Sequence, residues 1–136
     1  MNFTKIIYSE LNSKQKEIYN FQKVSASLAS YGYNCIKLTD DWNGADFIAY
    51  HFEADKTLLV QLKSRLTINK NYLQKNLYII FPIEGKWCLI KHDKLVDIIS
   101  SHTNFLNTNS WICDGKYHTQ SPSQILIQNL EDYLFN

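Results

Sequence analysis

The chain of 136 residues contains only two prolines, four glycines and three cysteines. The cysteines (Cys35, Cys88 and Cys113) are odd in number and far apart, so we expect no disulfide framework and a reducing, cytoplasmic location. No run of about eighteen apolar residues occurs, which excludes a membrane-spanning helix. The first ten residues lack an apolar core followed by small residues, so we expect no signal peptide.

Several catalytic and cofactor motifs are also missing. The isolated glycines form no G-x-G-x-x-G or Walker loop and no G-x-S-x-G elbow, which argues against nucleotide cofactors and Ser-His-Asp catalysis. Cys88-x3-His92 and Cys113-x4-His118 have zinc-ligand residue types, but their spacings are loose. Cys88 stands among apolar strand residues, where cysteine packs as a small hydrophobe, so we favour a structural role for it.

The length suits one domain spanning residues 1–136, long enough for a real core and too short for two. Charge is distributed unevenly in this domain. Between Lys56 and Lys94 there are eight cationic side chains and only two carboxylates, Glu84 and Asp93. Such an excess attracts a polyanion, although lysines guarding the edges of a sheet explain it equally well.

Hydrophobic periodicity predicts the elements of the fold. Apolar residues at spacings of three and four predict a helix over 10–31, with Ser13 as an N-cap and Gly32 ending the helix. A short helix is expected at 93–100, and a last helix follows Ser121 and Pro122. Residues 101–121 are expected to be mostly irregular. Short apolar runs predict five strands, at 34–38, 45–52, 57–65, 77–82 and 87–91.

This order of elements predicts an α/β (α+β) fold with a mixed central sheet of about five strands flanked by helices. The strand at 57–65 alternates, so Gln61, Lys63 and Arg65 share one face. The preceding strand begins with Gly44-Ala45-Asp46 and brings a carboxylate to its partner strand. Carboxylate, amide and carbonyl oxygens suit Mg²⁺, and a neighbouring lysine can hold a water or neutralise a phosphate.

Asp46, followed after a hairpin by Gln61-Leu62-Lys63, resembles the signature of the PD-(D/E)xK nucleases, with Gln in the (D/E) position. The resemblance is best over residues 10–65 and extends to about residue 100. It implies a restriction endonuclease-like core and Mg²⁺-dependent (or Mn²⁺-dependent) hydrolysis of phosphodiester bonds in nucleic acid, DNA in the first place. It also implies that Asp46 is the principal metal ligand, Gln61 the second and Lys63 the catalytic lysine, with the Leu62 carbonyl completing the metal shell.

Many members of that family carry an acidic residue on the first helix, facing the site. The comparable stretch here indicates Gln22 for this role, with Glu17 as a substitute. Neither Gln61 nor Gln22 carries a charge, so the metal site is short of negative charge. We therefore expect weak Mg²⁺ binding that substrate phosphates complete.

The residues that follow the Lys63 strand are candidates for contacts with nucleic acid. Arg65 and Lys70 are expected to hold the phosphate backbone without reading sequence, together with Lys75, and Tyr72 to stack on a base. The preferred function is that of a metal-dependent endodeoxyribonuclease. The alternative is a catalytically inactive module of the same fold that binds nucleic acid or a protein partner, and a homodimer is left open.

Overall fold

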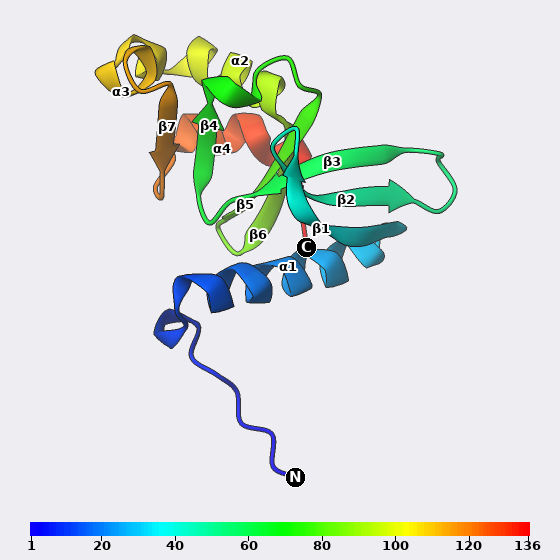
Figure 1. Ribbon diagram of the computed structural model, residues 1–136. Helices are drawn as coiled ribbons and strands as arrows, with labels where there is room; N and C mark the ends of the chain where they lie inside the picture. The colour runs from blue at the N-terminus through cyan, green and yellow to red at the C-terminus, as the bar shows by residue number, and fades with distance from the viewer.

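A computed structural model describes residues 1–136. An extended segment and a 3-10 turn, Tyr8–Glu10, precede helix α1, Ser13–Ala29 (Figure 1). Asn12 caps this helix: its side chain accepts the amide of Gln15 at 2.9 Å, and the Gln15 side chain accepts the Asn12 amide at 3.0 Å. The predicted first helix is confirmed, but it is capped by Asn12 rather than Ser13.

The central sheet has six strands in the order β1-β2-β3-β5-β6-β8. Neighbouring strands are antiparallel except β3 and β5, which run parallel. The strands are β1 (Tyr33–Trp42), β2 (Ala45–His51), β3 (Thr57–Leu62), β5 (Leu77–Ile83), β6 (Lys86–Lys91) and β8 (Leu134–Phe135).

The turn between β1 and β2 fixes where Asp46 stands. Asn43 and Gly44 both have positive φ, 54° and 86°, in a two-residue turn closed by the pairing of Trp42 with Ala45. Such a turn matches the twist of a hairpin and favours Asn-Gly. β1 therefore continues to Trp42, beyond the predicted end at residue 38, and Asp46 becomes the second residue of β2.

The segment between β3 and β5, and its partner strand later in the chain, differ from the predictions. The single strand expected over 57–65 ends at Leu62 and is followed by a separate strand, β4 (Leu66–Asn69), and a 3-10 turn, Lys70–Tyr72. β4 pairs with β7 (Lys116–Thr119) in a second, antiparallel sheet. Residues 101–121 were expected to be mostly irregular, apart from residues 111–113, yet they contain β7 and the short helix α3, Asn109–Ile112.

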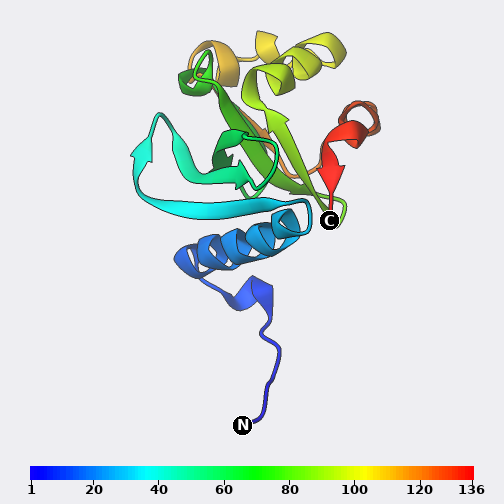
Figure 2. The ribbon, with the colours of Figure 1, turned by 90° about the vertical axis from the view of Figure 1, so that its right-hand side faces the viewer.

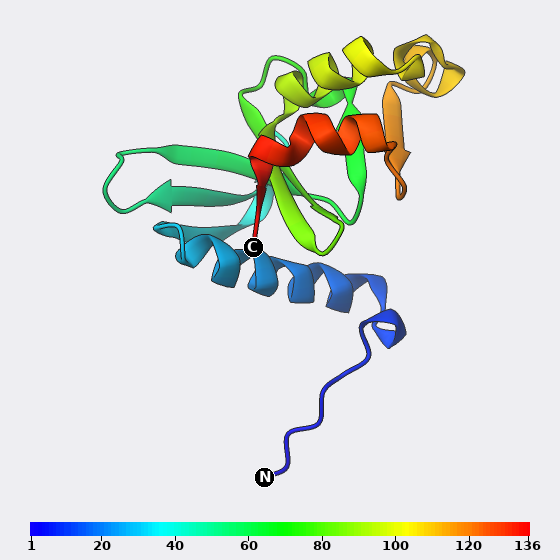
Figure 3. The same ribbon diagram turned by 180° about the vertical axis from the view of Figure 1, so that it is seen from behind.

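Helices lie on both sides of the central sheet (Figure 2). α1 packs Val24 and Leu28 on one face, against a cluster that includes Phe47 and Val60. On the other face, α2 (His92–His102) and α4 (Gln124–Leu130) lie side by side over β5 and β6 (Figure 3). A larger cluster of thirteen buried residues occupies that side, including Leu95 of α2.

The last helix is shorter than predicted. Ser123 rather than Ser121 caps α4 by accepting the amide of Leu126 at 3.3 Å, and after Leu130 the chain turns into strand β8. The α/β (α+β) class, with a mixed central sheet flanked by helices, is confirmed, and the sheet has six strands rather than about five. The predicted core required a helix, a strand, the strand that carries Asp46 and then a strand leading to Lys63. The elements α1, β1, β2 and β3 follow one another in that order.

Candidate active site

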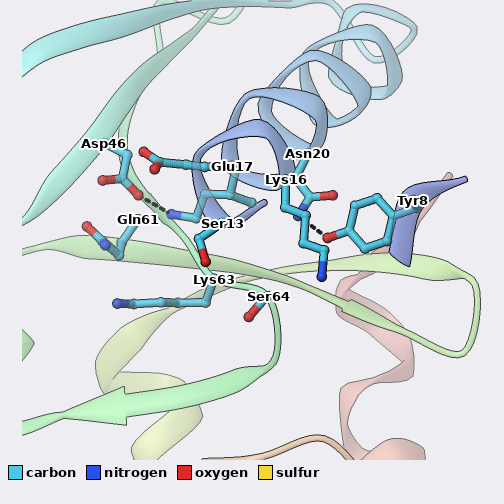
Figure 4. Close-up of a pocket in the computed structure, with 10 residues that line it drawn as sticks. Tyr8, Ser13, Lys16, Glu17, Asn20, Asp46, Gln61, Lys63 and Ser64 are labelled. Atoms are coloured by element: carbon cyan, nitrogen blue, oxygen red, sulfur yellow. Dashed lines mark hydrogen bonds between the residues drawn. The ribbon is translucent and has the colours of Figure 1, made fainter. Parts of the chain in front are cut away.

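A polar pocket of about 430 Å³ opens between the N-terminal half of α1 and the ends of β2 and β3 (Figure 4). It brings together side chains from the 3-10 turn, the first helix and two strands. The residues that line it are Tyr8, Ser13, Lys16, Glu17, Asn20, Asp46, Gln61, Leu62, Lys63 and Ser64. Asp46, Gln61, Leu62 and Lys63, which the sequence predicts to converge, therefore do so.

The pocket forms where the ladder between β2 and β3 stops. The last backbone pair at this end is Phe47 with Val60. Beyond it, the Asp46 carboxylate accepts the backbone N–H of Leu62 through Oδ2 at 2.8 Å. The side chain thus takes the place of the next backbone acceptor. Its Oδ1 has no hydrogen-bond partner in the protein and is available to a ligand.

Pro82 explains why β3 ends beside the pocket. The Lys63 amide still donates to the carbonyl of Ile80 at 2.9 Å. In a parallel ladder the Lys63 carbonyl would next accept the amide of residue 82, but proline has no N–H. Successive residues of a strand direct their backbone groups to opposite neighbours, so the carbonyl of Leu62 faces the β2 side, where Asp46 lies.

The charges around Asp46 oppose one another. Partial burial raises the pKa of this carboxyl group, and the Leu62 amide and the Lys63 ammonium lower it again. Asp41 and Glu17 add negative charge nearby and raise the pKa further. A cation bound among these carboxylates would relieve their mutual repulsion, so the charges suit a divalent ion.

Lys63 is held by an aromatic ring. Its Nζ lies 5.6 Å from the centroid of the Tyr72 ring and makes no ion pair. Tyr72 also contacts the turn before Asp46, because a Cβ at Gly44 would stand 3.3 Å from two of its ring atoms. The Tyr72 ring also packs at nearly a right angle to the ring of His92, with centroids 5.4 Å apart. One side chain thus touches the lysine and the turn that positions the carboxylate.

On α1, the structure places Glu17 at the pocket and not Gln22. The two residues are five positions apart, which is about 140° around a helix, so they cannot share a face. Gln22 is exposed and does not line the pocket, which corrects the expectation for the first helix. Glu17 is half exposed and forms ion pairs with Lys14 at 3.7 Å and Lys37 at 3.8 Å.

The donor set fits a hard cation, although no group of three or more His, Cys, Asp or Glu side chains is arranged to hold a metal. Asp46 and Glu17 offer carboxylate oxygens, and Gln61 offers an amide oxygen that no protein group bonds. Oxygen ligands with few carboxylates suit Mg²⁺, which keeps several of its waters. The fit is therefore to a weakly held Mg²⁺ or Mn²⁺.

The residues expected to contact nucleic acid lie outside the pocket. Lys70 packs its ammonium over Trp111, 5.5 Å from the ring centroid, and Lys75 is exposed. Arg65 is partly buried just before β4. The ring of Tyr72 contacts Lys63 and His92. A role of these residues in binding nucleic acid stays a prediction.

Five further residues of the pocket were not predicted from the sequence to belong to the site, namely Tyr8, Ser13, Lys16, Asn20 and Ser64. Asn20 lies three residues after Glu17 and Ser13 four residues before it, the spacing of neighbours on one face of a helix. Once Glu17 is placed at the site, that spacing indicates Ser13 and Asn20. Lys16 is adjacent to Glu17 in the sequence, so the spacing does not indicate it. Nothing local indicates Tyr8, which reaches the pocket only because the 3-10 turn folds back on α1.

The cysteine and histidine pairs have structural surroundings. Burial raises the pKa of the Cys88 thiol to about 12, which disfavours the thiolate that zinc binds. His92 is fully buried, and its Nε2 accepts the Asn69 amide at 3.1 Å. No helix has the length and hydrophobicity required to cross a bilayer.

No known family model matches the chain, and no curated protein does. Among solved structures, it is similar to Hjc, a Holliday junction resolvase from the archaeal hyperthermophile Archaeoglobus fulgidus. The two are 11% identical with a TM-score of 0.43, and the match covers 54% of this chain and 76% of that chain. At this distance no residue role passes from one protein to the other.

Proposed function

We propose that this protein is a divalent-metal-dependent nuclease of the PD-(D/E)xK type that hydrolyses phosphodiester bonds in DNA. The observation that carries the proposal is the convergence in one polar pocket of Asp46 from β2, Gln61 from β3 and Lys63 from just after β3. Isolated polar residues at strand ends point in many directions. Three of the types needed for phosphoryl chemistry meet here around a free carboxylate oxygen.

The metal would be Mg²⁺ or Mn²⁺, held by Asp46, Gln61 and the carbonyl of Leu62, with Glu17 as the second carboxylate. When bound, such an ion neutralises a phosphate oxygen and lowers the pKa of a water molecule. Few protein carboxylates surround it, so the substrate phosphate contributes to its binding. Metal affinity should therefore be weak without nucleic acid.

Lys63 has the second role. Its ammonium stands over Tyr72 and forms no ion pair, so its hydrogen atoms remain available to a substrate. We assign it to orienting the attacking water and stabilising the charge that develops on the phosphate. Tyr72 restricts the lysine side chain and reduces the entropy that it loses when substrate binds.

The test is cleavage of plasmid and of labelled linear DNA with Mg²⁺ or Mn²⁺. Lys63→Ala should lower the cleavage rate by roughly 10²–10³-fold, because one preorganised donor to the developing charge is lost. Asp46→Asn should abolish metal-dependent cleavage. Lys86→Ala is a matched control, because Lys86 is an exposed lysine in the β5–β6 hairpin that does not line the pocket.

The variants and the parent must all melt cooperatively before their rates are compared. Equal cleavage by Lys63→Ala and the parent would refute the assignment of the lysine. Intact DNA under every metal condition, with binding retained, would identify the protein as a non-catalytic binding module instead.

A further inference from the structure

The pocket extends well beyond the proposed metal ligands. Asp46 and Gln61 occupy one end, while Tyr8 and Lys16 occupy the other (Figure 4). The volume of about 430 Å³ exceeds the roughly 200 Å³ that an ion with six waters needs, at about 30 Å³ for each water. The far end therefore has room for a second group.

The side chains at the far end are donors without protein acceptors. Tyr8 Oη accepts a hydrogen bond from Asn20 Nδ2 at 2.9 Å, so the proton of the Tyr8 hydroxyl is free to be donated. Lys16 Nζ lies 5.5 Å from the centroid of the Tyr8 ring and forms no ion pair. Unused donors with a positive charge select an anion.

Two hydroxyl groups lie between these donors and the proposed metal ligands. Ser13 and Ser64 lie between the two ends of the pocket, one on α1 and one just after β3 (Figure 4). The carboxylates, Asp46 and Glu17, lie with Gln61 on the other side of them. The pocket is thus divided into an acidic part, suited to a cation, and a basic part, suited to a phosphate.

The far end is also fixed before any ligand arrives. The 3-10 turn is closed by backbone bonds from Glu10 to Ile7 and from Leu11 to Tyr8, at 3.0 and 3.1 Å. The ring of Tyr8 packs on Tyr19 of α1, with centroids 5.3 Å apart. A preformed set of donors loses little entropy on binding.

We infer that Lys16 and Tyr8, assisted by Ser13 and Ser64, form a second phosphate subsite that holds the neighbouring phosphodiester of a nucleic-acid strand. The inference rests on the proposed function, because that function supplies the strand in the cleavage position. The subsite contacts only the sugar-phosphate backbone, so it fixes the register of the strand and does not select its sequence.

The experiment measures binding apart from cleavage. Fluorescein-labelled single-stranded and duplex oligonucleotides are titrated with Asp46→Asn protein, which cannot cleave, and anisotropy is recorded over a range of salt concentrations. Adding Lys16→Gln should weaken binding about tenfold and reduce the slope of log K against log salt by about 0.7–0.9, one phosphate contact. Tyr8→Phe should weaken binding severalfold.

Lys23→Gln is the matched control, since Lys23 is an exposed lysine of the same helix that does not line the pocket. It should leave both affinity and salt slope unchanged. Unaltered affinity and slope for Lys16→Gln would overturn the subsite, as would a loss of equal size in Lys23→Gln. Melting curves of all these variants must agree with that of the Asp46→Asn protein from which they are made.

The two proposals fail in different ways. If the protein with Asp46 intact binds oligonucleotides through Lys16 but leaves DNA uncut with Mg²⁺ and Mn²⁺, the nuclease proposal fails and the subsite stands. If DNA is cut while Lys16→Gln changes neither the Michaelis constant nor the salt slope, the nuclease proposal stands and the subsite fails.

Discussion

At the scale of single residues, the position of Asp46 suits the binding of a ligand but lowers the stability of the folded protein. Burial is the main reason that its pKa is raised above 3.8, and the nearby carboxylates of Asp41 and Glu17 add to the effect. A carboxyl group whose folded pKa is raised contributes stability below its unfolded pKa and loses that contribution as pH rises through the folded pKa. At neutral pH the ionised group therefore costs the folded state free energy.

Replacing Asp46 with Asn should stabilise the protein at pH 7 while removing cleavage. Asn keeps an oxygen that can accept the Leu62 amide, yet it carries no charge. The urea midpoint should rise at pH 7 with an unchanged m-value, and the gain should shrink as the pH falls toward the pKa range.

Asp97→Asn is the control for this prediction, since Asp97 is an exposed carboxylate of α2. The free energy of unfolding of this variant should differ from that of the parent by no more than about 0.5 kcal/mol. A variant at Asp46 that is less stable at pH 7, or equally stabilised at every pH, would contradict the electrostatic explanation.

At the scale of elements, the segment between β4 and β5 connects the lysine to the core. His92 Nε2 accepts the Asn69 amide at 3.1 Å, and Asp93 accepts the Gln74 amide at 3.0 Å. The start of α2 thus holds both ends of the segment that carries Tyr72. Because Nε2 accepts a hydrogen bond, the ring carries its proton on Nδ1, facing Asp93 at 3.3 Å.

The stability of this segment should depend on pH through His92. Burial is the main cause that lowers the pKa of His92 below 6.5, and the hydrogen bond and charge of Asp93 partly raise it again. Stability from the neutral ring is present above pH 6.5 and is lost as the pH falls through the lowered pKa. His92→Gln should be less stable than the parent at pH 7.5 by about 1–3 kcal/mol, because the bond to Asn69 is weakened or lost.

Urea unfolding at pH 7.5 and at pH 5 tests this prediction. The difference in the free energy of unfolding between the parent and His92→Gln should be smaller at pH 5 than at pH 7.5. The remaining histidines are common to both proteins and cancel in the comparison. Parallel pH profiles would show that His92 does not titrate in that range.

The site residues that could be predicted are those whose sequence pattern spans only a few residues. Asp46, Gln61 and Lys63 were predicted because alternation along a strand and the order of strands are encoded over a few residues. Gln22 does not line the pocket because it lies on the opposite side of α1 from Val24, which packs against the sheet. Glu17 precedes Val24 by seven residues, about two helical turns, and therefore lies on the same face as Val24.

Longer-range pairing was not predictable in the same way. β4 has only four residues, and its partner β7 begins 50 positions further along the chain, at Lys116. Four-residue strands have little pattern of their own, so the expectation for 101–121 missed β7. The early end of β3 depends on Pro82 in a strand that follows a long connection.

At the scale of the whole molecule, the two hydrophobic clusters lie on opposite faces of one sheet. β5 joins them, because Ile79 and Phe81 belong to the larger cluster while Ile80 belongs to the smaller one. α1 depends on the smaller cluster and supplies Lys16 and Glu17 to the pocket. The pocket therefore depends on the packing of α1 against the sheet, and β5 couples that packing to the larger cluster.

This arrangement should make the protein unfold in one step. Leu28→Ala in the smaller cluster and Leu126→Ala in the larger one should each lower the free energy of unfolding by about 2–5 kcal/mol, since both side chains are at least 98% buried. In each variant, far-ultraviolet circular dichroism and tryptophan fluorescence should give coincident urea transitions. An early loss of helix in Leu28→Ala, with the fluorescence transition unmoved, would show instead that α1 detaches independently and that the pocket can open without unfolding the sheet.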